Sequence, residues 1–354
     1  MTRPRIALVS EVMHPPWDEG IRIFALNLLR QWSAQLTVLP IAEVASTVDG
    51  LEIVGALTNR WFVSRPLKAA LAGFSPDAIL YVPWTSVTAR TIARARVLTS
   101  YGGAPVAVLA LQPRGADMAQ RMLARVAPLD RILSCGPGVE AQARALGIEA
   151  VRIPAGVDLE RFRPLPEPAR AALRSRAGVA AGEFVVLHVG HLKATRNVDA
   201  LIDVARIAGV RAMLVASSST PADRATAARL REAGVIVMTH HQDRIEAVYQ
   251  LADAYLFPVT SALDAIEMPL SILEAAACDL SIVSTRFGAL PDLLGGQPGV
   301  LWAETREEVV ACVRDLAARR PQAQTRALVA DFGWDRVAQR VLEAIGGPKS
   351  RSAA

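Results

Sequence analysis

Lysine, cysteine and long apolar runs are all scarce in this chain of 354 residues. Only three of the 39 basic residues are lysines, so 39 − 3 leaves 36 arginines. Arginine is the better bidentate ligand for phosphate, although a biased coding composition explains such an excess equally well. The three cysteines lie far apart and form no CxxC pair, which excludes a disulfide framework and a zinc site: Cys135, Cys278 and Cys312.

No membrane-spanning or secretory segment is evident. The longest apolar runs, such as 105–111, fall far short of the ~18–20 residues that cross a bilayer. The opening MTRPRIALVSEV lacks the apolar stretch of a signal peptide. We therefore expect a cytoplasmic protein, with a peripheral contact at the inner membrane face as an option.

A role in nucleic-acid binding is also not expected. The net charge is +5, but the arginines are scattered and interleaved with Asp and Glu. Nucleic-acid binding would require a concentrated basic stripe with a recognition motif.

Short β-type runs alternate with helical stretches, the pattern of parallel sheets with crossover helices. In the first half, the predicted strands are 5–10, 36–41, 78–82, 106–111, 131–134 and 150–153. The pattern restarts in the second half at 184–189, 212–216, 235–238, 254–257 and 281–284. A Pro- and charge-rich stretch between the halves, ERFRPLPEPARAALRSRAG, is predicted to be a stiff connector. The sequence thus predicts two Rossmann-like domains, 1–165 and 166–332, with a helix over 333–347 crossing back to the first.

The segment AIEMPLSILEAAACDLSIVSTRFGALPDLL carries the strongest chemical signal. A turn containing Glu267 precedes a helix that is predicted to begin near Leu270, and the free N–H groups at such a start bind diphosphate. Glu274 is placed on the first turn, where a carboxylate can accept hydrogen bonds from ribose hydroxyls. The turn around Gly288 is expected to close over the same pocket. The alternative for Glu274 is a surface carboxylate that favours the helix N-terminus.

A second segment, LHVGHLKATRN, ends a buried strand at Gly190. His191, Lys193 and Arg196 follow within one loop, so three cations are predicted to converge where a diphosphate would lie. The alternative is a solvated basic loop. His188, on the strand itself, is predicted to be a satisfied core histidine.

These segments, together with GVDLERFRP, resemble the family 4 glycosyltransferases, over most of the chain. The resemblance implies a GT-B fold, in which two doubly wound parallel-sheet domains face a central cleft. It also implies transfer of a sugar from a nucleoside diphosphate, such as a UDP-sugar, with retention of anomeric configuration. No metal or other cofactor is implied.

Residue by residue, the resemblance gives Glu274 the ribose contact and Arg196 a diphosphate contact. It assigns the backbone that faces the phosphates to Leu270, Ser271 and Ile272. The family's first glutamate falls here on Ile266, so the contact to the donor sugar is predicted to pass to Glu267, with Asp264 as the alternative. His191 stands where the family commonly has arginine, and Arg196 and Lys193 are expected to compensate.

In the first half, SEVMHPPWDEGIRIF resembles the family's glycine-containing loop, with Gly20 at the turn before the first helix. His14 on this loop is a candidate to act near the transferred sugar. Gln112 stands where the family often has a histidine.

The segment TNRWFVSRPLKAALAGF combines Trp61 and Phe62 with positive charge, which suits an anionic membrane or a lipid-linked acceptor. An amphipathic helix packed on its own domain is the alternative.

We therefore predict a retaining hexosyltransferase that binds a nucleotide sugar and a small-molecule, glycan or lipid-linked acceptor. The catalytic candidates are Glu267, Arg196, Lys193 and His14, and the donor-binding candidates are Gly20, Gly190, His191, Leu270, Ser271, Ile272 and Glu274. Two alternatives stay open: a GT-B epimerase or hydrolase acting on the nucleotide sugar, and a non-catalytic nucleotide-sugar-binding subunit.

Overall fold

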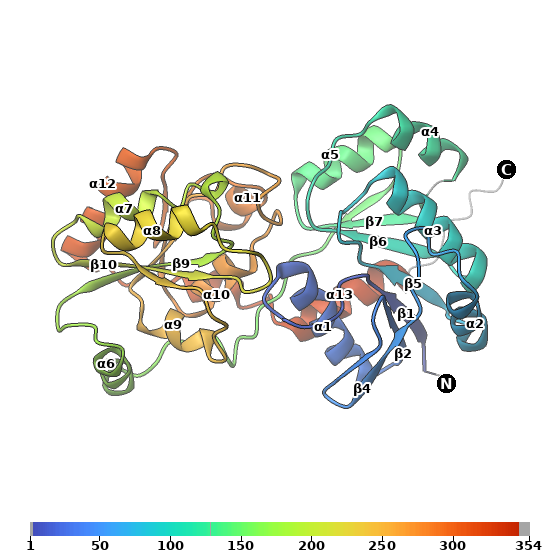
Figure 1. The fold of residues 1–354 in the computed structure, drawn as a ribbon, viewed down its shortest axis with the longest axis horizontal. Helices are drawn as coiled ribbons and strands as arrows, with labels where there is room; N and C mark the ends of the chain where they lie inside the picture. Colours follow the sequence, from blue (N-terminus) through green and yellow to red (C-terminus); the bar gives the residue numbers. More distant parts are fainter. Residues whose placement is uncertain (1–2, 128, 347–354) are drawn as a thin grey trace. The chain divides into compact units, whose positions relative to one another are not determined.

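The computed structural model describes residues 3–127 and 129–346. Within them the chain forms two compact units. The first unit contains the described residues up to Ala155 and again those from Trp334 on, and the second unit is Gly156–Gly333. The predicted division into two α/β domains is therefore present (Figure 1).

The first unit is built on an eight-stranded sheet in the order β3-β4-β2-β1-β5-β6-β7-β8. Its strands are β1 (Arg5–Val9), β2 (Thr37–Ala42), β3 (Ser46–Val48), β4 (Leu51–Gly55), β5 (Ala78–Tyr81), β6 (Val106–Ala110), β7 (Arg131–Ser134) and β8 (Ala150–Arg152). All neighbours pair in parallel except β3 with β4. The antiparallel β3–β4 pair is a hairpin that the predicted strand list lacks. Its turn is Asp49–Gly50, with φ of 51° and 77°, and Asp-Gly is a strong hairpin signal.

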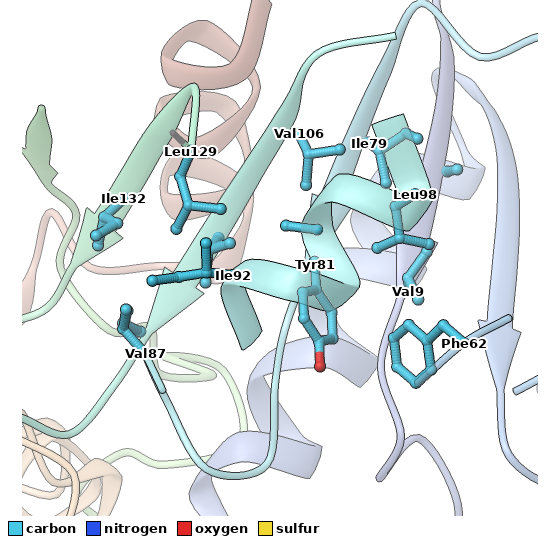
Figure 2. Close-up of a cluster of buried hydrophobic side chains, with 14 of the residues drawn as sticks. Val9, Phe62, Ile79, Tyr81, Val87, Ile92, Leu98, Val106, Leu129 and Ile132 are labelled. Carbon is cyan, nitrogen blue, oxygen red and sulfur yellow. The ribbon is translucent and has the colours of Figure 1, made fainter. Parts of the chain in front are cut away.

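Helices cover both faces of this sheet. They are α1 (Gly20–Ser33), α2 (Arg65–Phe74), α3 (Ala89–Gly102), α4 (Met118–Val126), α5 (Pro137–Leu146) and α13 (Trp334–Gly346). In Figure 1, α1 and α13 lie together on one face, while α2 to α5 follow one another on the other. Beneath α3, apolar side chains from β5, β6 and β7 pack into one cluster with Phe62 and Ile92 (Figure 2).

The helix α13 completes the first unit although the second unit separates it in sequence. The Trp334 ring meets Phe24 of α1 edge to face, with centroids 5.2 Å apart. The Trp32 indole Nε1 donates to the Ala338 carbonyl at 3.1 Å. The predicted helix over 333–347 is thus seen as α13 over its described residues.

The second unit has a six-stranded, all-parallel sheet in the order β11-β10-β9-β12-β13-β14. Its strands are β9 (Phe184–Gly190), β10 (Val210–Ala216), β11 (Ile236–Met238), β12 (Ala254–Phe257), β13 (Ser281–Ser284) and β14 (Val300–Trp302). Its α-helices are α6 (Glu167–Arg176), α7 (Ala200–Ala205), α8 (Arg224–Glu232), α9 (Ile245–Leu251), α10 (Leu270–Ala277), α11 (Leu290–Leu294) and α12 (Arg306–Arg319). In Figure 1, α7, α8 and α12 cover one face, and α9 and α10 cover the other.

Two expectations about the connector are wrong. Residues 156–165 belong to the second unit, because Phe162 packs on Tyr249 with ring centroids 5.5 Å apart and its carbonyl accepts from Arg326. The stretch beyond Pro166 forms the helix α6 and not a bare linker. Its arginines Arg170 and Arg174 both pair with Asp253, at 2.6 and 2.9 Å.

Candidate functional site

The chain order places a topological switch point in the second unit between β9 and β12. From β9 the next strands extend to one side through β10 and β11, and then the chain returns to place β12 on the other side. Open parallel sheets bind ligands beyond the carboxyl ends of their strands at such a point. The segments that follow β9 and β12 are the two that the sequence singles out.

Hydrogen bonds join these two segments. The Thr195 hydroxyl donates to the Asp264 carboxylate at 3.0 Å, and the Arg196 Nε donates to the Asp264 carbonyl at 2.8 Å. The Asn197 amide donates to the Pro258 carbonyl at 3.1 Å. Asn197 has a φ of 55°, a left-handed conformation that asparagine tolerates better than most residues. The two loops therefore form one structure at the edge of the sheet.

Arg196 lies buried across Gly190. A Cβ at Gly190 would fall 2.3 Å from Arg196 Nη1, so a side chain there would displace the guanidinium. Burial lowers the pKa of Arg196, and the nearby Asp264 opposes that shift without forming an ion pair with it in the described part of the chain. A buried cation without an ion-pair partner is costly unless an anion joins it.

The other two basic side chains of this loop have different surroundings. The His191 Nδ1 lies 2.6 Å from the Thr220 hydroxyl, beyond β10. Lys193 is exposed, and its ammonium makes no hydrogen bond or ion pair within residues 3–127 and 129–346. The three predicted cations thus share the loop, but Arg196 contacts Asp264, His191 contacts Thr220, and Lys193 is exposed.

The helix α10 offers an uncapped N-terminus at the same edge. Pro269 is its N-cap, no side chain caps it, and its first turn holds no acidic residue. The backbone N–H groups of Leu270 and Ser271 make no hydrogen bond within the described part of the chain, and Ile272 N–H reaches only the Pro269 carbonyl, at 3.1 Å. Free N–H groups and the helix dipole together favour an anion here.

Glu274 lies one turn further along than predicted. Because α10 begins at Leu270, Glu274 is its fifth residue and stands in the second turn. Its Oε2 accepts a hydrogen bond of 2.7 Å from the Tyr249 hydroxyl. Burial raises the pKa of Glu274 to about 6, and the Tyr249 hydrogen bond opposes that rise.

Glu267 and Asp264 both precede α10 but differ in their surroundings. The Glu267 residue is only 3% exposed, and its carbonyl accepts from Ala289 N–H at 2.9 Å. Gly288, with a φ of 52°, packs so tightly on Glu267 that a Cβ would lie 2.4 Å from that carbonyl oxygen. The turn after β13 thus closes on the Glu267 turn. Asp264, by contrast, is occupied in holding Thr195 and Arg196.

The first-unit candidates lie on the segment after β1. His14 is half-buried, and its Nδ1 lies 2.8 Å from the Pro15 carbonyl. Arg22 of α1 holds this segment by donating to the Pro16 carbonyl at 3.2 Å. Gly20 is the first residue of α1 and not part of a turn before it, since Glu19 is the N-cap.

The aromatic pair Trp61–Phe62 divides between surface and core. Trp61 is 46% exposed, whereas Phe62 is fully buried and packs edge to face on Tyr81 with centroids 5.5 Å apart (Figure 2). A surface role for Phe62 is therefore wrong. Its φ of 64° turns the chain inward at this point, which the sequence pattern does not reveal.

Three residues of the site escape the sequence prediction. Tyr249 and Tyr255 are fully buried. The third residue, His188, has no hydrogen-bond partner for its Nε2 among the described residues, so the prediction of a satisfied core histidine is wrong. Its Nδ1 lies 2.9 Å from the Leu256 carbonyl, and burial lowers the pKa of His188 to about 4. Only side-chain orientation reveals these roles, because no motif links Tyr249 to Glu274.

None of the described helices has both the length and the apolar character to cross a bilayer. Nor do the described residues hold three His, Cys, Asp or Glu side chains close enough to bind a metal ion.

The second unit is similar to known glycosyltransferases in sequence. Residues 183–319 match the family model described as glycosyl transferases group 1. A D-inositol 3-phosphate glycosyltransferase of Mycobacteroides abscessus is 29% identical over 205 residues, which are 54% of this chain and 45% of that protein. A GDP-mannose-dependent alpha-(1-6)-phosphatidylinositol dimannoside mannosyltransferase of Mycobacterium tuberculosis is 28% identical over 210 residues, covering 55% and 52%. The chain thus spans about half the length of the curated relatives it matches.

Solved structures share the fold across nearly the whole chain. Sucrose-phosphate synthase from Thermosynechococcus elongatus superposes with a TM-score of 0.76 at 17% identity, covering 97% of this chain and 98% of that one. HepE of Anabaena, in complex with UDP-glucose, has a TM-score of 0.76 at 14% identity, covering 97% and 100%. The GT-B fold is thereby confirmed, and the predicted resemblance to glycosyltransferases is confirmed for residues 183–319, which lie in the second unit.

Proposed function

We propose that the chain transfers a sugar from a nucleoside diphosphate to an acceptor hydroxyl. The observation that carries this proposal is the buried, unpaired Arg196 at the edge where α10 leaves its first N–H groups unbonded. Both features border one buried ring, since the Tyr255 side chain interacts with Ser271 and, electrostatically, with Arg196. A diphosphate would supply the ion-pair partner that Arg196 lacks among the described residues.

The proposed roles follow from these positions. Arg196, with Lys193 and the N–H groups of Leu270, Ser271 and Ile272, would stabilise charge that grows on the leaving diphosphate. Gly190 and His191 would line its approach, and Glu274 would accept from the ribose. Glu267 would hold the donor sugar, because a carboxylate can accept two ring hydroxyl hydrogen bonds. His14 and Gly20 would act from the first unit, the proposed acceptor domain.

Retention of configuration, and independence of a metal or other cofactor, are part of this proposal. The names of the relatives support a proposal for the donor and acceptor classes. They include D-inositol 3-phosphate and GDP-mannose-dependent glycosyltransferases, and HepE was solved with UDP-glucose. We therefore propose a UDP- or GDP-linked hexose as donor and a phosphorylated polyol or lipid-linked acceptor, with the reaction in the cytoplasm.

A release assay for nucleoside diphosphate, with and without acceptor, tests the activity. We expect UDP-glucose or GDP-mannose to yield nucleoside diphosphate only when a polyol phosphate such as inositol phosphate is present, with the sugar's anomeric configuration retained. Release without acceptor would instead identify a hydrolase. Tight binding without any turnover would favour the non-catalytic alternative.

Substitution of Glu267 tests its proposed contact. Glu267→Gln keeps the shape and removes the charge, so we expect slower transfer with nearly unchanged affinity for free nucleoside diphosphate. Asp264→Asn serves as the comparison. A loss of transfer with Asp264→Asn alone would give the donor-sugar contact to Asp264.

A further inference from the structure

Four aromatic rings form a continuous buried column through the second unit, here called the aromatic column: Phe162, Tyr249, Tyr255 and His188. Phe162 meets Tyr249 edge to face at 5.5 Å between centroids. Tyr249 stacks on Tyr255 at 5.9 Å and 20°, and Tyr255 stacks on His188 at 6.3 Å and 26°. Stacked rings of this size hold each other in place without any polar contact.

The two tyrosine hydroxyls of the column reach different parts of the proposed donor site. The Tyr249 hydroxyl donates to Glu274 Oε2 at 2.7 Å. The Tyr255 hydroxyl donates to the Val189 carbonyl at 3.1 Å, and its side chain interacts with that of Ser271. One ring therefore serves the proposed ribose contact, and the next serves the proposed phosphate contact.

The two oxygens of Glu274 differ in their surroundings. Oε2 accepts from Tyr249, whereas Oε1 makes no hydrogen bond within the described part of the chain. No cation forms an ion pair with Glu274 there either: Arg161 acts on it electrostatically but pairs with Glu246, at 2.9 Å. Tyr249 is thus the group that fixes this carboxylate.

We propose that Tyr249 is a positioning residue for ribose recognition: it anchors Glu274 Oε2, so that Oε1 is held ready to accept from the ribose hydroxyls. This inference rests on the proposed function. A glutamate side chain that is free to rotate must be ordered when the ligand binds, and that ordering weakens affinity. Anchoring by a buried tyrosine removes this cost before the nucleotide arrives.

A pair of matched variants tests the inference, since Tyr249→Phe and Tyr255→Phe each remove one hydroxyl from adjacent stacked rings. Titration calorimetry compares UDP or GDP with the corresponding 2′-deoxy and 3′-deoxy nucleotides. We expect Tyr249→Phe to reduce the preference for the ribonucleotide about two- to tenfold, the effect of ordering one side chain. Tyr255→Phe is expected to retain the preference. In a Glu274→Ala background, Tyr249→Phe should have no further effect.

Thermal unfolding of each variant controls for the fold. If Tyr249→Phe does not fold, Glu274→Asp is used in its place, because the shorter side chain withdraws the carboxylate from the Tyr249 hydroxyl without changing the tyrosine. This variant should lose the preference for the ribonucleotide to a similar extent. An unchanged preference in a folded Tyr249→Phe, or in Glu274→Asp, overturns the inference. The inference is also overturned if Tyr249→Phe weakens nucleotide binding as much in the Glu274→Ala background as in the wild-type background. If the wild-type protein binds no nucleoside diphosphate, the proposed function itself is refuted. If it binds nucleoside diphosphate without any preference for the ribonucleotide, only the proposed roles of Glu274 and Tyr249 are refuted.

Discussion

Glu274 is a residue whose burial favours the neutral form. Its pKa rises from 4.5 to about 6, so the folded state holds a proton that the unfolded chain releases at lower pH. Stability from this group is present below about pH 4.5 and is lost as the pH rises through about 6. A carboxylate kept at this position therefore costs stability at neutral pH, which fits a residue selected for binding.

Glu274→Gln should consequently stabilise the unliganded protein. We expect a gain of about 1–2 kcal/mol at pH 8, where the buried carboxylate must be charged, and little gain near pH 4.5. Urea unfolding at both pH values measures it, with the exposed Glu232→Gln as control. An equal gain at pH 4.5 and pH 8 would contradict the prediction.

Gly190 offers a second prediction at the residue scale. In Gly190→Ala the new Cβ would lie 2.3 Å from Arg196 Nη1 and 3.3 Å from His188 Nε2, so we expect the guanidinium to shift. Affinity for nucleoside diphosphate should fall about tenfold, the loss of one charge-assisted hydrogen bond, while affinity for the plain nucleoside stays unchanged.

Isothermal titration with both ligands makes the comparison. Gly73→Ala is the control, since a Cβ at Gly73 meets nothing within 4 Å. Equal losses for nucleoside and nucleoside diphosphate would show that Gly190 matters for the fold and not for Arg196.

Motif spacing predicts the backbone of this site but not its buried partners. Glu274, Arg196 and Gly190 stand in recognisable strand–loop and loop–helix patterns. Tyr249 contacts Glu274 from a different helix, 25 positions away, and no local pattern encodes such a contact. The inward turn of Phe62 likewise depends on one left-handed residue.

Among the elements, the parallel strands are the most predictable. Their continuous apolar runs reflect burial on both faces, and β7, β12 and β13 have the predicted bounds. The edge strand β3 lacks such a run, and β14 consists of only three half-buried residues. The sequence does not predict the helix α6, because its prolines suggest a connector. Pro166 is the N-cap of α6, however, and Pro168 lies in its first turn, where proline is tolerated.

The helix α13 leads to a prediction at the element scale. Trp334 is 6% exposed and packs on Phe24, so Trp334→Ala should destabilise the first unit by about 3–5 kcal/mol. Because α13 belongs to the first unit alone, scanning calorimetry should show one transition shifted downward and the other unchanged. The exposed Arg340→Ala, on the same helix, should shift neither. A parallel shift of both transitions would contradict the assignment of α13 to one unit.

At the scale of the molecule, every proposed donor contact except Gly20 and His14 lies in the second unit. The two ends of that unit meet, since Val157 N–H donates to the Phe332 carbonyl at 2.8 Å and Val157 pairs with Gly333. We therefore expect a fragment 156–333 to fold and to bind nucleoside diphosphate with affinity within about tenfold of the full chain, without transferring sugar. Calorimetric titration of the fragment, with its Glu274→Ala variant as control, measures this. A folded fragment that binds nothing would place an essential contact in the first unit.

The position of α13 in the chain also bears on synthesis at the ribosome. The sheet of the first unit emerges first, but the helix that covers Phe24 and Trp32 emerges only after all of Gly156–Gly333. At about 5–20 residues per second, that interval lasts on the order of ten seconds or more. During it the α1 face of the nascent first unit lacks its cover, whereas the second unit has its whole sequence available as soon as Gly333 has emerged. The later half of this protein is thus the first that can reach its native state, which reverses the usual N-to-C order and leaves an apolar nascent surface for a chaperone to protect.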